Sequence, residues 1–389
     1  MRGWLLALWL AALPAWPQPV PVVVGAVVSE TGQLADLALE MRKALLLWQE
    51  ERNAAGGLLG RPVRLRLLDD RSEAAAALAL YTQLIEQERA DLLIGPFGSA
   101  ASVAAAAIAE RARRVLINAT GVTRGVQRAD WRYVFQVPAP AAEYGAGALA
   151  LARAAGHSRL RVVARNEPGA REAAERLAAE AAALGMQAPL HTVTPGNKDY
   201  TAQIAAARAQ RTEAWIAFGR TEDAAEMVKA FKRAGYAPAM FLAQGAAEPG
   251  FVQRVGQDAE LALGITAYEP GFVTRGNAEF VARWRERWKS EPGLIAANAY
   301  SAALVLEAAV RAAGGLEQER LRAALAALET ETPIGRYRVG EGGVQLGAEP
   351  AVVQIQRGRT EIVWPRALAT AQLRLPYPRW DQRQVHAAQ

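Results

Sequence analysis

Ser99 is the residue whose type and position in this 389-residue sequence best suit chemistry. It follows an apolar run and a glycine-containing turn, and it opens the alanine-rich stretch 100–113, which predicts a helix. A helix N-terminus with unpaired backbone N–H groups, beside a small hydroxyl, suits a carboxylate or another anion. The alternative is that Ser99 only caps the helix, with its hydroxyl accepting hydrogen bonds from the first-turn N–H groups.

The sequence lacks the patterns that identify most catalytic and metal-binding sites. The histidines, His157, His191 and His386, do not have the spacing of paired metal ligands, and no Gly-x-Ser-x-Gly motif surrounds Ser99. Glycine patterns that bind phosphate after a strand do not occur, and the chain has no cysteine. We therefore expect no enzyme activity, no metal site and no cofactor.

The segments on either side of Ser99 predict how that residue is positioned. The apolar runs 92–94 and 115–117 are typical of short buried strands of a parallel sheet, and the helix over 100–113 would join them. In such a βαβ unit, the residue that follows the first strand lies at the carboxyl edge of the sheet. Ligands of parallel sheets bind at that edge.

The same alternation of strands and helices runs through the rest of the chain. Before Ser99, strands are predicted at 20–28 and 63–68, and helices at 37–53 and 74–88. After the turn at 138–140, helices are predicted at 141–156, 168–184, 200–210 and 221–235, and strands at 160–164, 187–193, 215–218 and 240–243. Helices at 275–289, 296–313 and 316–328 follow, and then short strands between 337 and 364. This order predicts an α/β fold with two doubly wound parallel-sheet lobes.

The first 18 residues have the composition of a secretory signal peptide. They contain one arginine, an apolar run from Trp4 to Leu13 and an end rich in proline and alanine. We expect this segment to be cleaved and the mature chain to be periplasmic. The net charge of +6 arises from 45 basic and 39 acidic residues without a long run of like charges, which argues against nucleic acid as a partner.

Several segments resemble the type I periplasmic solute-binding proteins, the leucine/isoleucine/valine-binding receptors of ABC importers. The most specific segment is NAAGGLLGRPVRLRLLDD at 53–70. The likeness continues through RVVARNEPGAREAAERLA and EAWIAFGRTEDAAEMVKAFKRAGY to VWPRALATAQLRLPYPRW, so it extends over nearly the whole mature chain.

This resemblance implies two lobes joined by three crossovers, near residues 138–141, 266–270 and 345–350. The first lobe would comprise 19–139 and 269–347, and the second lobe 140–268 and 348–389. A monomer would close about this hinge on a small-molecule solute, and a membrane permease would recognise the closed form. The alternative within the same fold is the ligand-sensing receptor of a signalling system.

The resemblance also assigns binding roles in the first lobe. Ser99 matches the serine that holds the α-carboxylate of the solute, and Thr120 matches a position whose backbone carbonyl receives the ammonium group. Val122 stands where the family has a hydroxyl residue. Thr123 could provide that hydroxyl after a shift of one residue.

In the second lobe, the matching positions differ from those of the amino-acid receptors. Arg220 stands where those receptors have tyrosine, Gln244 replaces the glutamate that pairs with the ammonium, and Gly169 replaces another ligand tyrosine. Because a buried ammonium needs a paired charge and arginine suits a carboxylate, this pattern favours an organic acid over an amino acid. In the alternative interpretation, Arg220 is a solvated residue or pairs with Glu222, and amino acids remain possible solutes.

Overall fold

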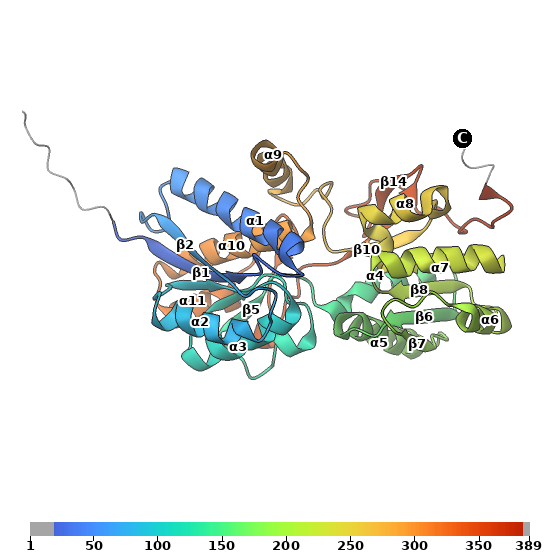
Figure 1. Cartoon of the computed structure of the whole chain (residues 1–389), viewed down its shortest axis with the longest axis horizontal. Helices are drawn as coiled ribbons and strands as arrows, with labels where there is room; N and C mark the ends of the chain where they lie inside the picture. The colour runs from blue at the N-terminus through green and yellow to red at the C-terminus, as the bar shows by residue number, and fades with distance from the viewer. Residues whose placement is uncertain (1–18, 384–389) are drawn as a thin grey trace, which may run out of the picture.

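The protein consists of two α/β lobes that lie side by side along the long axis of the molecule (Figure 1). The computed structural model describes residues 19–383, so the predicted signal peptide lies outside the described residues. Each lobe is built on its own sheet, one of five strands and one of seven. The predicted fold class is therefore confirmed.

The sheet of the first lobe is parallel throughout and has the strand order β2-β1-β3-β4-β5. Its strands are β1 (Val22–Val28), β2 (Val63–Asp69), β3 (Leu92–Ile94), β4 (Leu116–Asn118) and β5 (Val134–Gln136). All seven residues of β1 are buried, as expected for a central strand covered on both faces. The order changes direction between β1 and β3, and the residues after β3 and β4 lie beside this point.

Helices cover both faces of the first sheet. Even-numbered residues of β1, such as Val24, pack in a core with three helices, α1 (Ala35–Ala54), α10 (Leu294–Ala313) and α11 (Gln318–Ala327). Odd-numbered residues, such as Val23, pack against α2 (Ala76–Glu86) and α3 (Ser99–Ala112). Helix α9 (Asn277–Trp288) adds Phe280 and Trp284 to the first of these cores.

Helix α10 is the one helix among residues 19–383 that is long and apolar enough to cross a membrane, judged by length and composition. Its most apolar 18-residue window is 72% buried inside the protein. It makes its largest set of contacts with α1, and its buried side chains belong to the core of the first lobe. Its composition therefore suits a central helix of that core.

The sheet of the second lobe has the order β14-β13-β10-β9-β8-β6-β7. Its parallel strands are β6 (Leu160–Arg165), β7 (Leu190–Val193), β8 (Ala214–Phe218), β9 (Met240–Ala243) and β10 (Leu263–Thr266). The strands β13 (Ala351–Gln356) and β14 (Arg359–Trp364) extend it as an antiparallel edge. One face is covered by α4 (Ala146–Ala154) and α5 (Pro168–Ala183), and the other by α6 (Thr201–Ala209), α7 (Thr221–Ala234) and α8 (Pro249–Val255).

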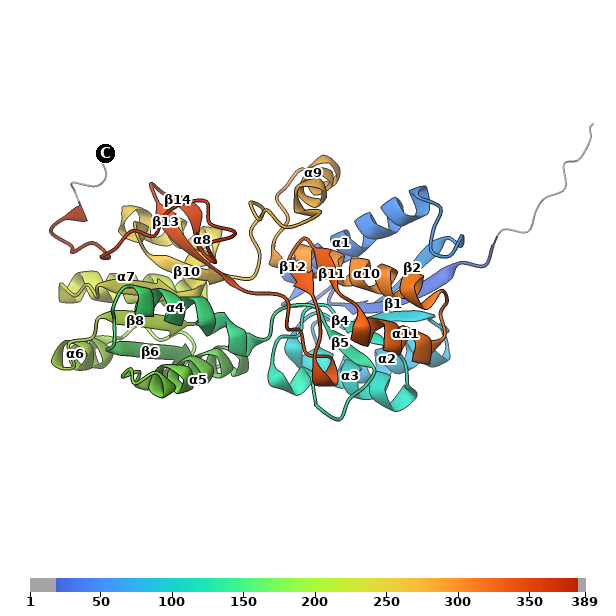
Figure 2. The same cartoon turned by 180° about the vertical axis from the view of Figure 1, so that it is seen from behind.

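The chain passes between the lobes three times, and Figure 2 shows these connections from behind. It leaves the first lobe after β5, returns after β10, and leaves again after the hairpin of β11 (Thr330–Thr332) and β12 (Gly335–Tyr337). The first crossover ends in a 3-10 turn, η2 (Ala141–Gly145), where the sequence predicts the start of a helix. The exact boundaries of the lobes stay a prediction.

Two strands of the two large sheets are absent from the sequence prediction. They are β5, with three residues, and β10, with four. Such short segments do not show a measurable alternation of polar and apolar residues. Both strands immediately precede a crossover, so their pairing with neighbouring strands is what positions the hinge.

Candidate functional site

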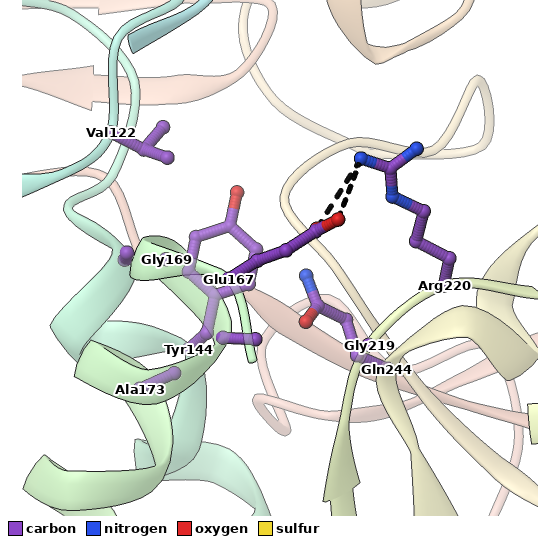
Figure 3. Close-up of a pocket in the computed structure, with 10 residues that line it drawn as sticks. Val122, Tyr144, Glu167, Gly169, Ala173, Gly219, Arg220 and Gln244 are labelled. Carbon is purple, nitrogen blue, oxygen red and sulfur yellow. Dashed lines mark hydrogen bonds and ion pairs between the residues drawn. The ribbon is translucent and has the colours of Figure 1, made fainter. Parts of the chain in front are cut away.

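A pocket of about 250 Å³ lies where the two lobes meet (Figure 3). The first lobe contributes Val122, from the loop that follows β4, and the second lobe contributes the remaining residues. These are Ala141 and Tyr144 from η2, Glu167, Gly169, Ala170 and Ala173 from the start of α5, Gly219 and Arg220 after β8, and Gln244 after β9. The pocket therefore lies at the carboxyl ends of strands from both sheets. Ligands of parallel α/β sheets bind at this edge.

Arg220 and Glu167 form an ion pair on the wall of this pocket. The Arg220 Nη2 atom donates to both carboxylate oxygens of Glu167, at 3.1 and 3.3 Å (Figure 3). The backbone N–H of Arg220 donates to the Asp223 carboxylate at 2.9 Å, which fixes the loop between β8 and α7. Arg220 thus pairs with Glu167 and not with Glu222, and its side chain is 62% exposed to solvent.

Arg165, the last residue of β6, holds Glu167 from the other side. Its Nε atom lies 2.8 Å from the Glu167 carboxylate, and its Nη1 atom contacts Asp223 at 3.0 Å and Glu222 at 3.2 Å. Burial alone would lower the pKa of Arg165, but hydrogen bonds to Glu167 and Asp223 outweigh burial and raise it. Arg165 is therefore a permanent cation, and only 9% of its side chain is exposed.

Gln244 is the first residue of a 3-10 turn, η3 (Gln244–Ala247), and its amide lies between Arg220 and Tyr144 in Figure 3. No other side chain or backbone group among residues 19–383 forms a hydrogen bond with this amide. The next residue, Gly245, packs directly on the Arg220 loop, because a Cβ atom there would lie 2.2 Å from the Arg220 carbonyl carbon. The Gln244 side chain is thus available to a solute, while its backbone is fixed.

Tyr144 contributes an aromatic ring and a hydroxyl to the same pocket (Figure 3). The residue is 9% exposed, and its hydroxyl has no hydrogen-bond partner in the described part of the chain. Burial, with a smaller contribution from the nearby Glu248 carboxylate, raises the pKa of Tyr144 to about 12. The hydroxyl is therefore neutral near pH 7 and can donate or accept a hydrogen bond.

Ser99 does not cap its helix. The N-cap of α3 is Gly98, in a left-handed conformation with φ of 84°, and Ser99 is the first helical residue. Its hydroxyl oxygen instead accepts from the backbone N–H of Val122 at 3.1 Å. The helix-cap interpretation is therefore wrong, and Ser99 supports the loop that contributes Val122 to the pocket.

Thr120 and Thr123 do not line the pocket. The Thr120 hydroxyl donates to the Pro96 carbonyl at 2.7 Å and accepts from the Gly98 N–H at 2.9 Å, so its side chain joins the two loops that follow β3 and β4. Thr123 precedes a 3-10 turn, η1 (Arg124–Val126). Of the six predicted site residues, Val122, Arg220 and Gln244 meet in one pocket.

Hydrogen bonds with two residues of the second lobe, Glu172 and Ala141, hold the Val122 loop. The Glu172 carboxylate on α5 accepts from the backbone N–H of Arg124 at 3.0 and 3.2 Å, and the Ala141 N–H donates to the Val122 carbonyl at 2.8 Å. These bonds fix the backbone on the first-lobe side of the pocket to the second lobe, close to the first crossover.

Sequence reasoning missed Glu167 and Tyr144. Glu167 has a weak signal, since it follows an apolar strand and precedes Pro168, which is favoured in the first turn of a helix. Tyr144 has none, because it lies in a segment whose pattern predicts an ordinary helix. Within residues 19–383, no three His, Asp or Glu side chains are grouped as they would have to be to hold a metal ion.

Comparison with known proteins shows which family the sequence matches. Residues 21–360 match the family model described as periplasmic binding protein. The Leu/Ile/Val-binding protein homolog 7 of Brucella abortus is 23% identical over 405 residues, which covers 97% of this chain and 100% of that protein.

Solved structures with the same fold include two ABC transporter proteins. A putative branched-chain amino acid ABC transporter protein from Silicibacter pomeroyi has a TM-score of 0.82 at 20% identity and covers 92% of this chain and 99% of its own. A solute-binding protein of an ABC transporter from R. palustris, in complex with benzoate, has a TM-score of 0.71 at 20% identity, with coverage of 91% and 98%. With two sheet-based lobes, three crossovers and a family match over most of its length, the chain belongs to the periplasmic binding protein family.

Proposed function

We propose that this protein is the solute-binding protein of an ABC importer and that it holds a small organic carboxylate between its lobes. The observation that carries the proposal is the position of Arg220, whose guanidinium lines a pocket built from both lobes. Only its Nη2 atom has a hydrogen-bond partner among the described residues, Glu167. A planar guanidinium that is held through a single atom suits a solute carboxylate, which can pair with two of its N–H groups.

The charges in the pocket favour an acid without an amino group. Gln244 supplies a neutral amide, and the single carboxylate of the lining, Glu167, already contacts two arginines. A solute ammonium would have to displace these cations or remain unpaired, and an unpaired buried charge costs several kcal/mol. A solute carboxylate meets Arg220, the Gln244 amide and the Tyr144 hydroxyl.

The size and the remaining lining restrict the solute further. Ala141, Ala170 and Ala173 form an apolar wall beside the polar groups. A cavity of about 250 Å³ is slightly smaller than typical ligand pockets, which measure about 300–1,000 Å³. A short aliphatic acid or a single-ring aromatic acid therefore fits, and the benzoate complex of a protein with the same fold supports this class.

The proposed partner is a membrane permease, with the protein exported to the periplasm, cleaved after its signal peptide and monomeric. Closure of the lobes about the crossovers would bury the solute and form the surface that the permease recognises. The solved ABC transporter proteins of this fold support transport, and no observation favours the signalling alternative. We do not expect nucleic acid as a partner.

Thermal-shift screening of the mature chain, residues 19–389, against aliphatic and aromatic carboxylic acids, α-amino acids, amides and polyamines tests this function. We expect carboxylic acids to raise the melting temperature, because a ligand that binds only the folded state stabilises it. Arg220→Ala should weaken binding of the best acid by about tenfold or more, the scale of a lost hydrogen bond to a charged group. Arg176→Ala is the matched control, since Arg176 lies on α5 and pairs with Glu180 away from the pocket.

The organic-acid assignment is wrong if only α-amino acids stabilise the protein and Arg220→Ala leaves their affinity unchanged.

A further inference from the structure

Glu167 lies where a solute carboxylate would bind Arg220. Both oxygens of its carboxylate are within 3.3 Å of the Arg220 Nη2 atom, and both residues line the pocket (Figure 3). A solute that binds Arg220 through a carboxylate would therefore offer the same chemical group as Glu167 does. In the solute-free protein, the Glu167 carboxylate thus occupies the Arg220 guanidinium, which is the group that a solute carboxylate would bind.

The two arginines that hold Glu167 differ in how firmly they are placed. Arg165 is 9% exposed and is fixed by Asp223 and Glu222 as well as by Glu167. Arg220 is 62% exposed, and its guanidinium contacts Glu167 alone among the described residues. Exposed ion pairs contribute only about 0–1 kcal/mol, so the contact with Arg220 is the weaker one.

Glu167 can therefore release Arg220 at little cost. Rotation of the Arg220 side chain breaks the exposed contact, while the ion pair with Arg165, whose Nε atom lies 2.8 Å from the carboxylate, keeps Glu167 paired. No charge is left without a partner in this exchange, because the solute carboxylate replaces Glu167 on Arg220.

We propose that Glu167 is a specificity-determining residue of the pocket, which occupies Arg220 in the solute-free protein and yields it to an incoming organic carboxylate. The proposal rests on the proposed function, because it takes the solute to be a carboxylate. Glu167 lowers the affinity for every anion, so only an acid whose hydrocarbon part also fills the apolar wall displaces it. Small inorganic anions, which lack that part, are excluded.

The competing role for Glu167 would be to pair with the ammonium group of an amino acid. Glu167 would then do what a glutamate does in the amino-acid receptors, at the position where this chain has Gln244. The geometry argues against that role. An ammonium at Glu167 would approach two guanidinium groups that already contact the same carboxylate, at 2.8 and 3.1 Å. An ammonium on the same carboxylate would lie close to both guanidinium groups, and repulsion between like charges opposes its binding.

The test compares Glu167→Gln with the unchanged protein by titration calorimetry. The compounds are straight-chain acids from propionic to octanoic, benzoic acid, the primary amide of each acid, and leucine. Glu167→Gln should bind the acids about twofold to fivefold tighter, because an exposed ion pair no longer has to be broken. Affinity for the uncharged amides should not change.

Two further variants make the result specific. Glu222→Gln removes a carboxylate that contacts Arg165 but does not line the pocket, and it should leave every affinity unchanged. Adding Arg220→Ala to Glu167→Gln should abolish the gain for the acids, because the two residues act through one contact.

Equal or weaker acid binding by Glu167→Gln overturns the proposal. Loss of leucine binding in that variant would instead assign Glu167 to an ammonium group. If neither protein binds any acid, the proposed function itself is wrong and the inference falls with it. The melting temperature of Glu167→Gln should stay close to that of the unchanged protein.

Discussion

The hydroxyl oxygen of Ser99 accepts a hydrogen bond from the backbone N–H of Val122 at 3.1 Å. Ser99 begins α3 and Val122 lines the pocket, so this bond connects the N-terminus of a helix to the loop that faces the second lobe. A serine that the sequence predicts to be an anion site therefore supports the wall of the pocket through its hydroxyl.

Ser99→Ala should weaken solute binding by about 0.5–1.5 kcal/mol, the net contribution of an ordinary hydrogen bond, because the loop that carries Val122 loses its support, and should leave the melting temperature nearly unchanged. Calorimetry with the best solute and a thermal melt measure the two effects. Ser102→Ala is the control, because the Ser102 hydroxyl bonds the Gly98 carbonyl at 2.8 Å inside the lobe, so its loss should affect stability only. A lower melting temperature with unchanged affinity for Ser99→Ala would show that Ser99 stabilises the fold without shaping the pocket.

Gln244→Glu should lower the affinity for carboxylic acids by about tenfold or more and raise that for α-amino acids. The change keeps the shape of the side chain and adds a negative charge, which repels a carboxylate and attracts an ammonium group at short range. Gln257→Glu adds the same charge to an exposed position of the same lobe and should change neither affinity. Acid affinities that survive Gln244→Glu would show that the carboxylate does not approach residue 244.

Glu269 makes the stability of the protein depend on pH. Burial, with a smaller contribution from the nearby Glu248 carboxylate, raises the pKa of Glu269 from 4.5 to about 7. An acid whose pKa is raised by folding favours the folded state when protonated. Its contribution is therefore fully present below pH 4.5 and is lost as the pH rises through about 7.

Denaturant unfolding should thus show that the free energy of unfolding falls as the pH is raised from 4.5 to 8. This fall should be smaller in Glu269→Gln than in the unchanged protein. Glu279→Gln, at an exposed position of α9, serves as the control and should retain the full dependence. An identical pH profile for Glu269→Gln and the unchanged protein would exclude this residue as the cause.

Small-angle scattering should show a smaller radius of gyration when the best solute is added at saturation. The three crossovers allow the lobes to rotate, and a solute that contacts both lobes favours the closed arrangement. Arg220→Ala should not contract at the same solute concentration. A scattering profile that does not change on saturation contradicts hinge closure.

Apart from α8, which the sequence does not predict, the helices and longer strands follow from local pattern, and the sequence predicts them well. The βαβ unit around Ser99 has apolar strands, a helix of strong helix formers and a glycine turn, and all of these signals agree. The strands β5 and β10 could not be predicted, because three or four residues carry too little pattern and their pairing depends on strands distant in sequence.

The pocket is harder to predict because it depends on which side chains meet in space. The resemblance to the family selects Arg220 and Gln244, and each lies within two residues of the end of a buried strand. The sequence does not reveal that Glu167, more than fifty positions before Arg220, holds its guanidinium. That contact changes the fixed charge of the pocket from positive, as the sequence suggests, to a neutral ion pair.

Gly245 determines how the solute preference of this protein can change. Because its Cα packs against the Arg220 backbone, any side chain at residue 245 would push apart the two loops that contribute Arg220 and Gln244 to the pocket. Insertions or a longer residue there would disturb both positions at once. Adaptation to a new solute, in evolution or by engineering, is therefore expected to proceed by exchanging the side chains at 220 and 244 on an unchanged backbone.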